Sequence, residues 1–358
     1  MRIEERIVIL FSVIDPDKSR LTKAEELLKS GLDWDYLLKV SKQHGVACLL
    51  YYHLNRFGFQ GYLPPAIFKE LESIYYNNCA RNTLIYEELA RLLSIFEQSQ
   101  IKVILLKGIF LAEAVYKNIA LRQMSDMDIL IKKDDFFRIG KVLLDSGYSA
   151  ADSINTSFND PLSYSVLFAK VDRLRSISIS IDLHWDILTS TWMRSFIAGR
   201  VNPEKIWSEA SSVNIAGANA LALSCQHHLF HLCLHSFSHS FERLILLTDI
   251  FEFVRNYQDR IDWNDAREEA KLLGLEGTLS YCLYYTYRSL KPRDPKQIRL
   301  KTINADYQRK AILFLIQKKL KFYGLPCLIY ILLQNKIQDV YKLTLKAVFL
   351  LRKRLLTR

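Results

Sequence analysis

Glycine and proline, the residues that most often interrupt regular structure, are scarce in this chain: it has 12 glycines and 8 prolines among 358 residues. A sandwich or barrel of many short strands needs frequent turns, and these two residues form most of them. The sequence therefore favours a largely helical protein. Half of the residues are hydrophobic and 24% are charged, which is typical of a globular protein and excludes a disordered one.

The hydrophobic periodicity changes twice along the chain. A helical period runs through about the first hundred residues and returns toward the C-terminus, and short apolar runs of strand length lie between. We therefore expect an α/β core between helical regions. The predicted divisions are an N-terminal helical region at 1–100, the α/β core at 101–190, a helical domain at 191–310 and a basic amphipathic helical tail at 311–358.

The clearest strand of the core covers residues 177–185. Its apolar residues alternate with polar ones, which places Asp182 and His184 together on one face. Weaker strand candidates are 103–106, 127–131 and 164–170. The expected helices begin at Trp34 after Asp33, at Pro64 or Pro65, at Ile109 and at Asp134 or Asp135, and four more cover 218–239, 241–257, 262–273 and 276–290.

The candidate chemistry lies in the segment SDMDILI, residues 125–131. Asp126 and Asp128 are two apart on a predicted strand and so point the same way, and Asp182 is a third acid on a later strand. Clustered carboxylates need a cation, and oxygen ligands suit Mg²⁺ or Mn²⁺ better than zinc. Three such carboxylates can hold two magnesium ions that activate a hydroxyl and stabilise a leaving pyrophosphate. The alternative for Asp126 and Asp128 is a turn or a helix cap.

Lys107 and Gly108 stand between a predicted strand and a predicted helix. A glycine there lets backbone N–H groups approach a phosphate, and a helix N-terminus attracts anions. Lys107 and Arg122 would supply charge to a triphosphate; alternatively, both are solvated surface residues. His184 either steers a phosphate or the acceptor, or makes one ordinary hydrogen bond.

These motifs together resemble the uncharacterised nucleotidyltransferase family of the DNA polymerase beta-like nucleotidyltransferase superfamily. The resemblance rests on LLKG at 105–108, SDMDILI at 125–131 and IDLHW at 181–185, and spans about residues 30–290. It implies an α+β fold, in which a small mixed sheet is flanked by helices. It also implies transfer of a nucleoside monophosphate from a nucleoside triphosphate (NTP) to an acceptor. The implied metal and catalytic residues are Asp126, Asp128 and Asp182, and the candidate nucleotide-binding residues are Lys107, Gly108, Arg122, Ser125 and His184.

Five histidines lie between residues 227 and 239, and four of them are spaced by four, so they form one stripe on a helix. His231 and His235 have a spacing that suits zinc, but no glutamate lies between them to act as a metalloprotease base. The alternative is a polar seam where this helix meets the catalytic core. The family pattern places His235 and Asp249 facing an acceptor pocket.

Positive charge is concentrated in the tail. The net charge is +11, and residues 311–358 contribute +9 of it. Such a segment can lie on an anionic membrane, contact nucleic acid or pack on the body with its lysines in water. The acceptor is a small molecule, a protein or a nucleic acid. The alternative function is a non-catalytic nucleotide-binding or scaffold protein that acts through partner or membrane contacts of the tail.

The sequence shows no features of export or of a membrane span. The first residues carry Glu4 and Glu5 where a secretory signal would have basic residues, and no apolar run reaches the roughly 18 residues of a span. The six cysteines show no paired spacing typical of a zinc or redox motif. We therefore expect free thiols and a cytoplasmic protein, with peripheral membrane contact through 311–358.

Overall fold

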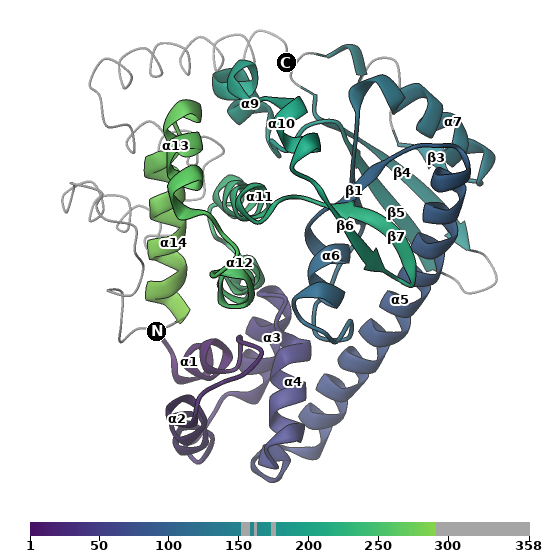
Figure 1. The fold of residues 1–358 in the computed structure, drawn as a ribbon. Coiled ribbons are helices and arrows are strands. Elements are labelled where there is room, and N and C mark those ends of the chain that lie inside the picture. The colour runs from purple at the N-terminus through teal and green to yellow at the C-terminus, as the bar shows by residue number, and fades with distance from the viewer. Residues whose placement is uncertain (152–157, 161–162, 173–176, 291–358) are drawn as a thin grey trace, which may run out of the picture.

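The computed structural model describes residues 1–151, 158–160, 163–172 and 177–290, and the predicted tail at 311–358 lies outside this part of the chain. One mixed sheet is bordered by helices from both ends of the sequence (Figure 1). The α+β fold class is confirmed. The five described cysteines are free thiols.

The N-terminal region is helical, as predicted. Asp33 caps a helix by accepting a hydrogen bond from the Tyr36 N–H, and Pro65 occupies the first turn of a 34-residue helix. The elements are α1 (Ile3–Leu10), α2 (Lys18–Leu28), α3 (Trp34–Gln43), α4 (Ala47–Arg56), the 3₁₀ helix η1 (Phe59–Tyr62) and α5 (Pro65–Gln98).

The sheet has seven strands in the order β3-β4-β5-β2-β1-β7-β6. The neighbours β2 and β5 run parallel, as do β1 and β7, and the other pairs are antiparallel. The four predicted strands of the core are all present. The strands are β1 (Val103–Leu105), β2 (Met127–Ile131), β3 (Ser149–Ala150), β4 (Ser165–Asp172), β5 (Ile177–His184), β6 (Ser211–Ile215) and β7 (Ala218–Ala222).

The helix predicted over 218–239 is wrong for its first residues, which form a β-hairpin. Ala216 and Gly217 connect β6 to β7 with backbone φ angles of 56° and 73°, the conformation of a tight two-residue hairpin turn. Strand β7 then pairs in parallel with β1, which places Leu221 beside Ile104. The sheet therefore extends past residue 190, where the predicted core ends.

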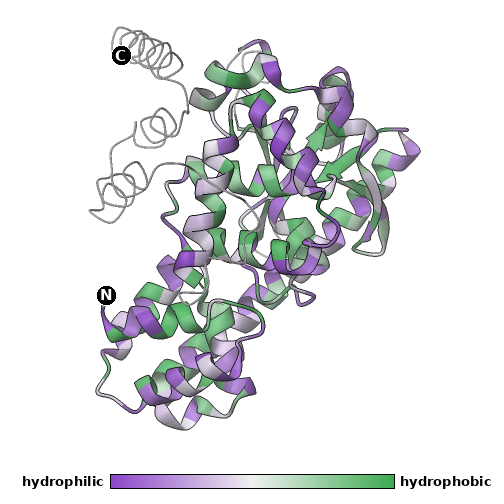
Figure 2. Ribbon diagram, turned by 60° about the vertical axis from the view of Figure 1, so that its left-hand side comes forward, coloured by the Kyte–Doolittle hydropathy of each residue, from purple (hydrophilic) through white to green (hydrophobic). Residues whose placement is uncertain are grey.

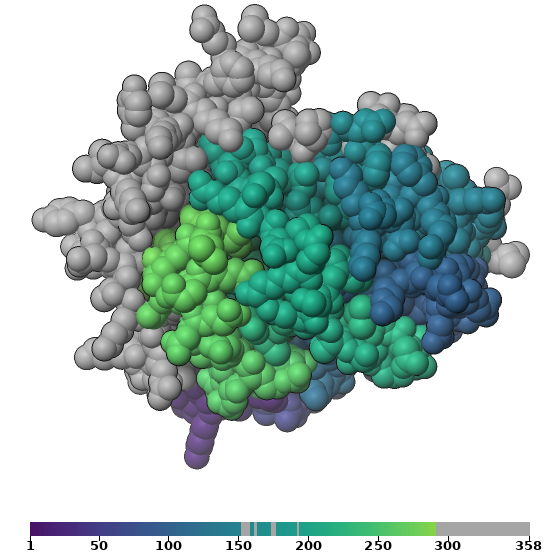
Figure 3. All heavy atoms as spheres, turned by 45° about the horizontal axis from the view of Figure 1, so that its top comes forward, coloured from purple at the N-terminus to yellow at the C-terminus, as the bar shows by residue number. Residues whose placement is uncertain are grey.

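The remaining helices cover the sheet and form a C-terminal bundle. Helix α11 packs against α12 and α14, and nearly all residues of α12 are buried. Each helix carries both hydrophobic and hydrophilic residues along its length (Figure 2). In the space-filling view, the C-terminal helices and the sheet region form one continuous surface (Figure 3). These elements are α6 (Lys107–Ala114), η2 (Lys133–Asp135), α7 (Phe136–Asp145), α9 (Thr191–Ile197), η3 (Ala198–Arg200), α10 (Pro203–Ser208), α11 (Cys225–Ser238), α12 (Leu244–Tyr257), α13 (Trp263–Leu273) and α14 (Glu276–Leu290).

In the part of the chain that the structure describes, no helix is both long enough and apolar enough to cross a membrane.

The buried His53 in α4 predicts a loss of stability in acid. Its Nε2–H donates a 2.8 Å hydrogen bond to the Val13 carbonyl, and burial lowers its pKa from 6.5 to about 4. Because the unfolded chain binds this proton more readily, the histidine contributes stability above pH 6.5 and loses it as the pH falls toward 4. We expect a loss of about 3 kcal/mol in the free energy of unfolding from this residue.

Urea unfolding at several pH values checks this expectation against His53→Gln, which keeps an N–H donor but does not titrate. The variant should lose less stability than the wild type between pH 7 and pH 4. Equal losses in the two proteins would show that His53 is not responsible.

Candidate active site

Two neighbouring parallel strands bring the predicted acids together. The register of β2 and β5 places Asp128 directly beside Asp182, and His184 follows two residues later on the same face of β5. One carboxylate oxygen from each aspartate and one ring nitrogen of His184 lie within 4.8 Å of one another. The His184 Nε2 atom is 3.1 Å from Asp128 Oδ1 and 3.0 Å from Asp182 Oδ2. These three side chains form a group that could hold a metal ion.

Lys107 contacts this acid cluster from the end of β1, which lies on the opposite side of β2 from β5. It begins α6 directly after β1, it is buried, and its Nζ lies 2.5 Å from Asp128 Oδ1. Its backbone φ angle is 43°, in the left-handed region that costs a non-glycine residue roughly 1 kcal/mol. The Leu106 N–H donates to the Asp128 carbonyl and so fixes the start of this turn against β2. The turn therefore holds the ammonium group of Lys107 at the carboxylates.

Gly108 is required by close packing. A Cβ atom at this position would lie 2.8 Å from Arg122 Nη1 and 3.1 Å from Met124 Cβ, both closer than ordinary contact. A side chain here would therefore push Arg122 or Met124 away. Close packing against Arg122 and Met124 therefore explains the glycine at position 108. Phosphate binding by Gly108 stays a prediction.

Asp126 lies beside the cluster and has no positive partner among the described residues. The hydroxyl of the exposed Ser125 donates a 2.9 Å hydrogen bond to Asp126 Oδ1. Burial and the negative charge of Asp128 raise the pKa of Asp126. Among the described residues, Asp126 is therefore the acid of the predicted triad that forms no ion pair, and the charge of Lys107 offsets only part of the rise in its pKa.

The other charges of the site are balanced. Burial alone would raise the pKa of Asp128, but Lys107 and His184 hold it well below its usual range. Burial also acts to lower the pKa of His184, but Asp182 and Asp128 outweigh it and raise the pKa to about 9. An ammonium and an imidazolium group therefore face two carboxylates at neutral pH.

Arg122 is buried in an ion pair with Asp249 of α12. Its Nη2 lies 2.7 Å from Asp249 Oδ2, its Nε donates to Asp249 Oδ1, and the Tyr116 hydroxyl donates to Oδ1 at 2.7 Å. Asp249 is only 2% exposed, so the interpretation that it faces an acceptor pocket is wrong. These bonds link the core to the C-terminal helices, and triphosphate binding by Arg122 stays a prediction.

Sequence analysis missed Arg81 of α5. Its guanidinium donates to the carbonyls of Ser125, at 3.0 Å, and Ser178, at 3.3 Å. These carbonyls belong to the segments that lead into Asp126 and Asp182, so Arg81 ties both acid strands to α5. Its partners are 44 and 97 residues away in sequence, and no local pattern indicates this pairing.

The histidine stripe lies on α11 and favours the polar-seam interpretation. His231 Nδ1 lies 2.9 Å from the Ile187 carbonyl, and His227 Nε2 lies 3.0 Å from Glu269. Burial lowers the pKa of His231 and His235 well below the usual value, and the charge of Lys107 adds to this effect. In the described ranges, the group that could hold a metal contains none of the stripe.

The sequence and the structure were compared with known proteins. No curated protein matches the chain. A nucleotidyltransferase-like antigenic protein of solved structure, from Paracoccidioides brasiliensis, is similar at 12% identity and a TM-score of 0.34, over 55% of this chain and 91% of that one. Residues 30–291 match the family described as "Uncharacterised nucleotidyltransferase". This match covers most of the chain and agrees with the predicted resemblance, so the protein belongs to the uncharacterised nucleotidyltransferase family.

Proposed function

We propose that the protein is a magnesium-dependent nucleotidyltransferase that transfers a nucleoside monophosphate from an NTP to an acceptor. The observation that supports this proposal is the pairing of Asp128 with Asp182 on the parallel strands β2 and β5, with His184 within reach of both and Asp126 one residue before β2. Asp126 forms no ion pair among the described residues, and burial and the negative charge of Asp128 raise its pKa above the ordinary value. A bound divalent cation would supply the missing positive charge.

The donor set fits Mg²⁺ or Mn²⁺. Carboxylate oxygens from Asp126, Asp128 and Asp182 are the ligands that these ions prefer. The two carboxylates of the compact group are already within 4.8 Å of each other and of His184. When bound, the metal would supply charge stabilisation and an activated hydroxyl for an in-line displacement.

The side chains around the acids would orient the nucleotide. His184 bonds both Asp128 and Asp182, so it would fix the directions of their oxygens. Lys107 would neutralise triphosphate oxygens from its position at the start of α6, with Gly108, Ser125 and Arg122 as further predicted contacts. The acceptor, whether a small molecule, a protein or a nucleic acid, stays a prediction, as do the cytoplasmic location and membrane contact by the tail.

One observation favours the alternative of a non-catalytic nucleotide-binding or scaffold protein. Lys107 Nζ already bonds Asp128, so the two central carboxylates are neutralised by the protein itself. A site of this kind is stable without a metal ion.

Calorimetric titration of each of the four ribonucleoside triphosphates, with and without Mg²⁺, separates the two functions. We expect binding that requires Mg²⁺ in the wild type and is lost in Asp126→Asn. Nucleotide binding that is equal with and without Mg²⁺, in both proteins, would support the non-catalytic function. Absence of binding by any of the four would contradict both nucleotide proposals.

A further inference from the structure

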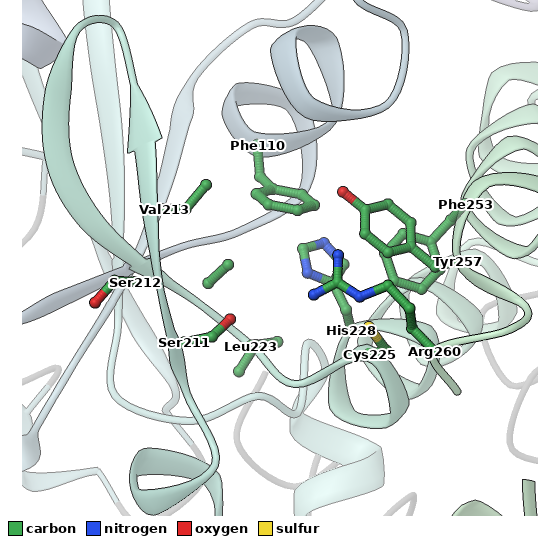
Figure 4. A pocket seen from close by; sticks show the side chains of 11 residues that line it. Phe110, Ser211, Ser212, Val213, Leu223, Cys225, His228, Phe253, Tyr257 and Arg260 are labelled. Atoms are coloured by element: carbon green, nitrogen blue, oxygen red, sulfur yellow. The ribbon is translucent and has the colours of Figure 1, made fainter. Parts of the chain in front are cut away.

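A small cavity lies between the β6–β7 hairpin and the helices α6, α11 and α12 (Figure 4). Its volume is about 110 Å³, which is room for about four water-sized groups. The lining includes the rings of Phe110, His228 and Tyr257, and Arg260. None of these four side chains belongs to the acid cluster, so the cavity is a separate site.

The interior of the cavity is bounded by stacked rings. The His228 ring centroid lies 4.4 Å from that of Phe110 and 4.9 Å from that of Phe253, and Phe253 stacks on Tyr257 at 4.8 Å. These rings give the cavity an apolar wall that favours aliphatic groups.

His228 is the unusual member of this wall. It is 1% exposed, and neither of its ring nitrogens has a hydrogen-bond partner among the described residues. A buried polar group without a partner costs roughly 1–3 kcal/mol. Burial lowers the pKa of His228 to about 3, so the ring is neutral and offers one donor and one acceptor.

Arg260 is the one charged residue of the eleven that line the cavity. It is exposed, and its guanidinium lies 5.2 Å from the centre of the Tyr257 ring. It forms no ion pair with any residue in the described ranges. Figure 4 shows the Arg260 and Tyr257 side chains on the same side of the cavity. A cation beside a wall of rings, in a cavity that is also lined by Ser211 and Ser212, matches a ligand with an anionic end and a short hydrocarbon body.

We propose that this cavity binds a small organic carboxylate, with its carboxylate on Arg260 and its short aliphatic body among the rings of Phe110, His228 and Tyr257. The volume excludes a nucleotide or a peptide side chain much longer than about four heavy atoms. The proposal does not depend on nucleotidyl transfer.

The cavity shares α6 with the acid cluster and α11 with the histidine stripe. Phe110 is three residues after Lys107 on α6, and His228 is three residues before His231 on α11. Residues three apart on a helix are neighbours. A carboxylate in the cavity would therefore contact the same helical turns that position Lys107 and His231.

Ligand-observed NMR and calorimetric titration of the full chain with isobutyrate test the proposal. Isobutyramide has the same body without the charge, and acetate has the charge without the body. We expect saturable binding of isobutyrate and much weaker binding of both controls. Arg260→Gln should reduce isobutyrate affinity roughly tenfold or more, which is the loss of a charged hydrogen bond.

Two further variants complete the design. Arg288→Gln removes an exposed arginine of α14, away from the cavity lining, and should bind isobutyrate like the wild type. His228→Ala removes one ring of the wall that would hold the aliphatic body and should bind isobutyrate more weakly. Equal affinity for isobutyrate and isobutyramide, unchanged binding by Arg260→Gln, or no saturable binding by the wild type would each overturn the proposal. Since Arg260 is exposed, its replacement leaves the fold intact.

Discussion

Replacing Asp128 by asparagine is expected to abolish nucleotide turnover and to destabilise the protein. The carboxylate is a proposed metal ligand, and it is also the partner of the buried Lys107 at 2.5 Å. Removing one partner of a buried ion pair leaves a buried charge unpaired, which costs about 3–5 kcal/mol. Asp126→Asn should lose about a thousandfold in turnover, equivalent to about 4 kcal/mol, and keep its stability.

The contrast follows from the partners of the two acids. Asp126 has no positive partner among the described residues, and its raised pKa shows that its charged form is disfavoured in the fold. An uncharged asparagine there should be neutral or slightly stabilising without metal. Magnesium-dependent release of pyrophosphate from an NTP measures turnover, and thermal melting in the presence of a chelator measures stability. Full turnover by a folded Asp126→Asn would remove this residue from the metal site.

Breaking the Arg122–Asp249 pair is expected to have the largest effect on stability. Both side chains are at most 10% exposed, and Asp249 also accepts a hydrogen bond from Tyr116. Arg122→Ala or Asp249→Asn should each lower the free energy of unfolding by about 3–5 kcal/mol, because the remaining group stays buried without its partner.

Urea unfolding of both single variants and of Arg122→Met/Asp249→Leu checks this expectation. The double variant should recover part of the loss, since two apolar side chains leave no buried charge. The sequence alone predicts a different result for Arg122→Ala, namely weaker triphosphate binding. Unchanged stability with reduced NTP affinity would support that role for Arg122.

The site was partly predictable because strand alternation is a local rule. The two-residue spacing of Asp126 and Asp128, and the alternation that places Asp182 with His184, predict one polar face on each strand. The parallel pairing of β2 with β5 then brings these faces together. The compact group of the structure contains His184 and not Asp126, because Asp126 lies one residue before β2 begins, where the alternation of a strand no longer fixes the direction of its side chain.

Other features depend on distant residues and were not predictable. The pairs of Arg122 with Asp249 and of Arg81 with Ser178 join segments that are 127 and 97 residues apart. Strand β7 was mistaken for helix because alanine and leucine, good helix formers, dominate Ala218–Ala222. Its strand conformation comes from pairing with β1, and tertiary pairing overrides such a propensity.

The pairing of β7 with β1 has a consequence for dissecting the protein. A fragment that ends at residue 190 would lack β7, so one edge of β1 would lose its parallel neighbour and expose unpaired N–H and C=O groups. Exposed strand edges of this kind recruit other chains. We therefore expect an excised 101–190 fragment to aggregate, and an expression boundary should lie beyond Ala222.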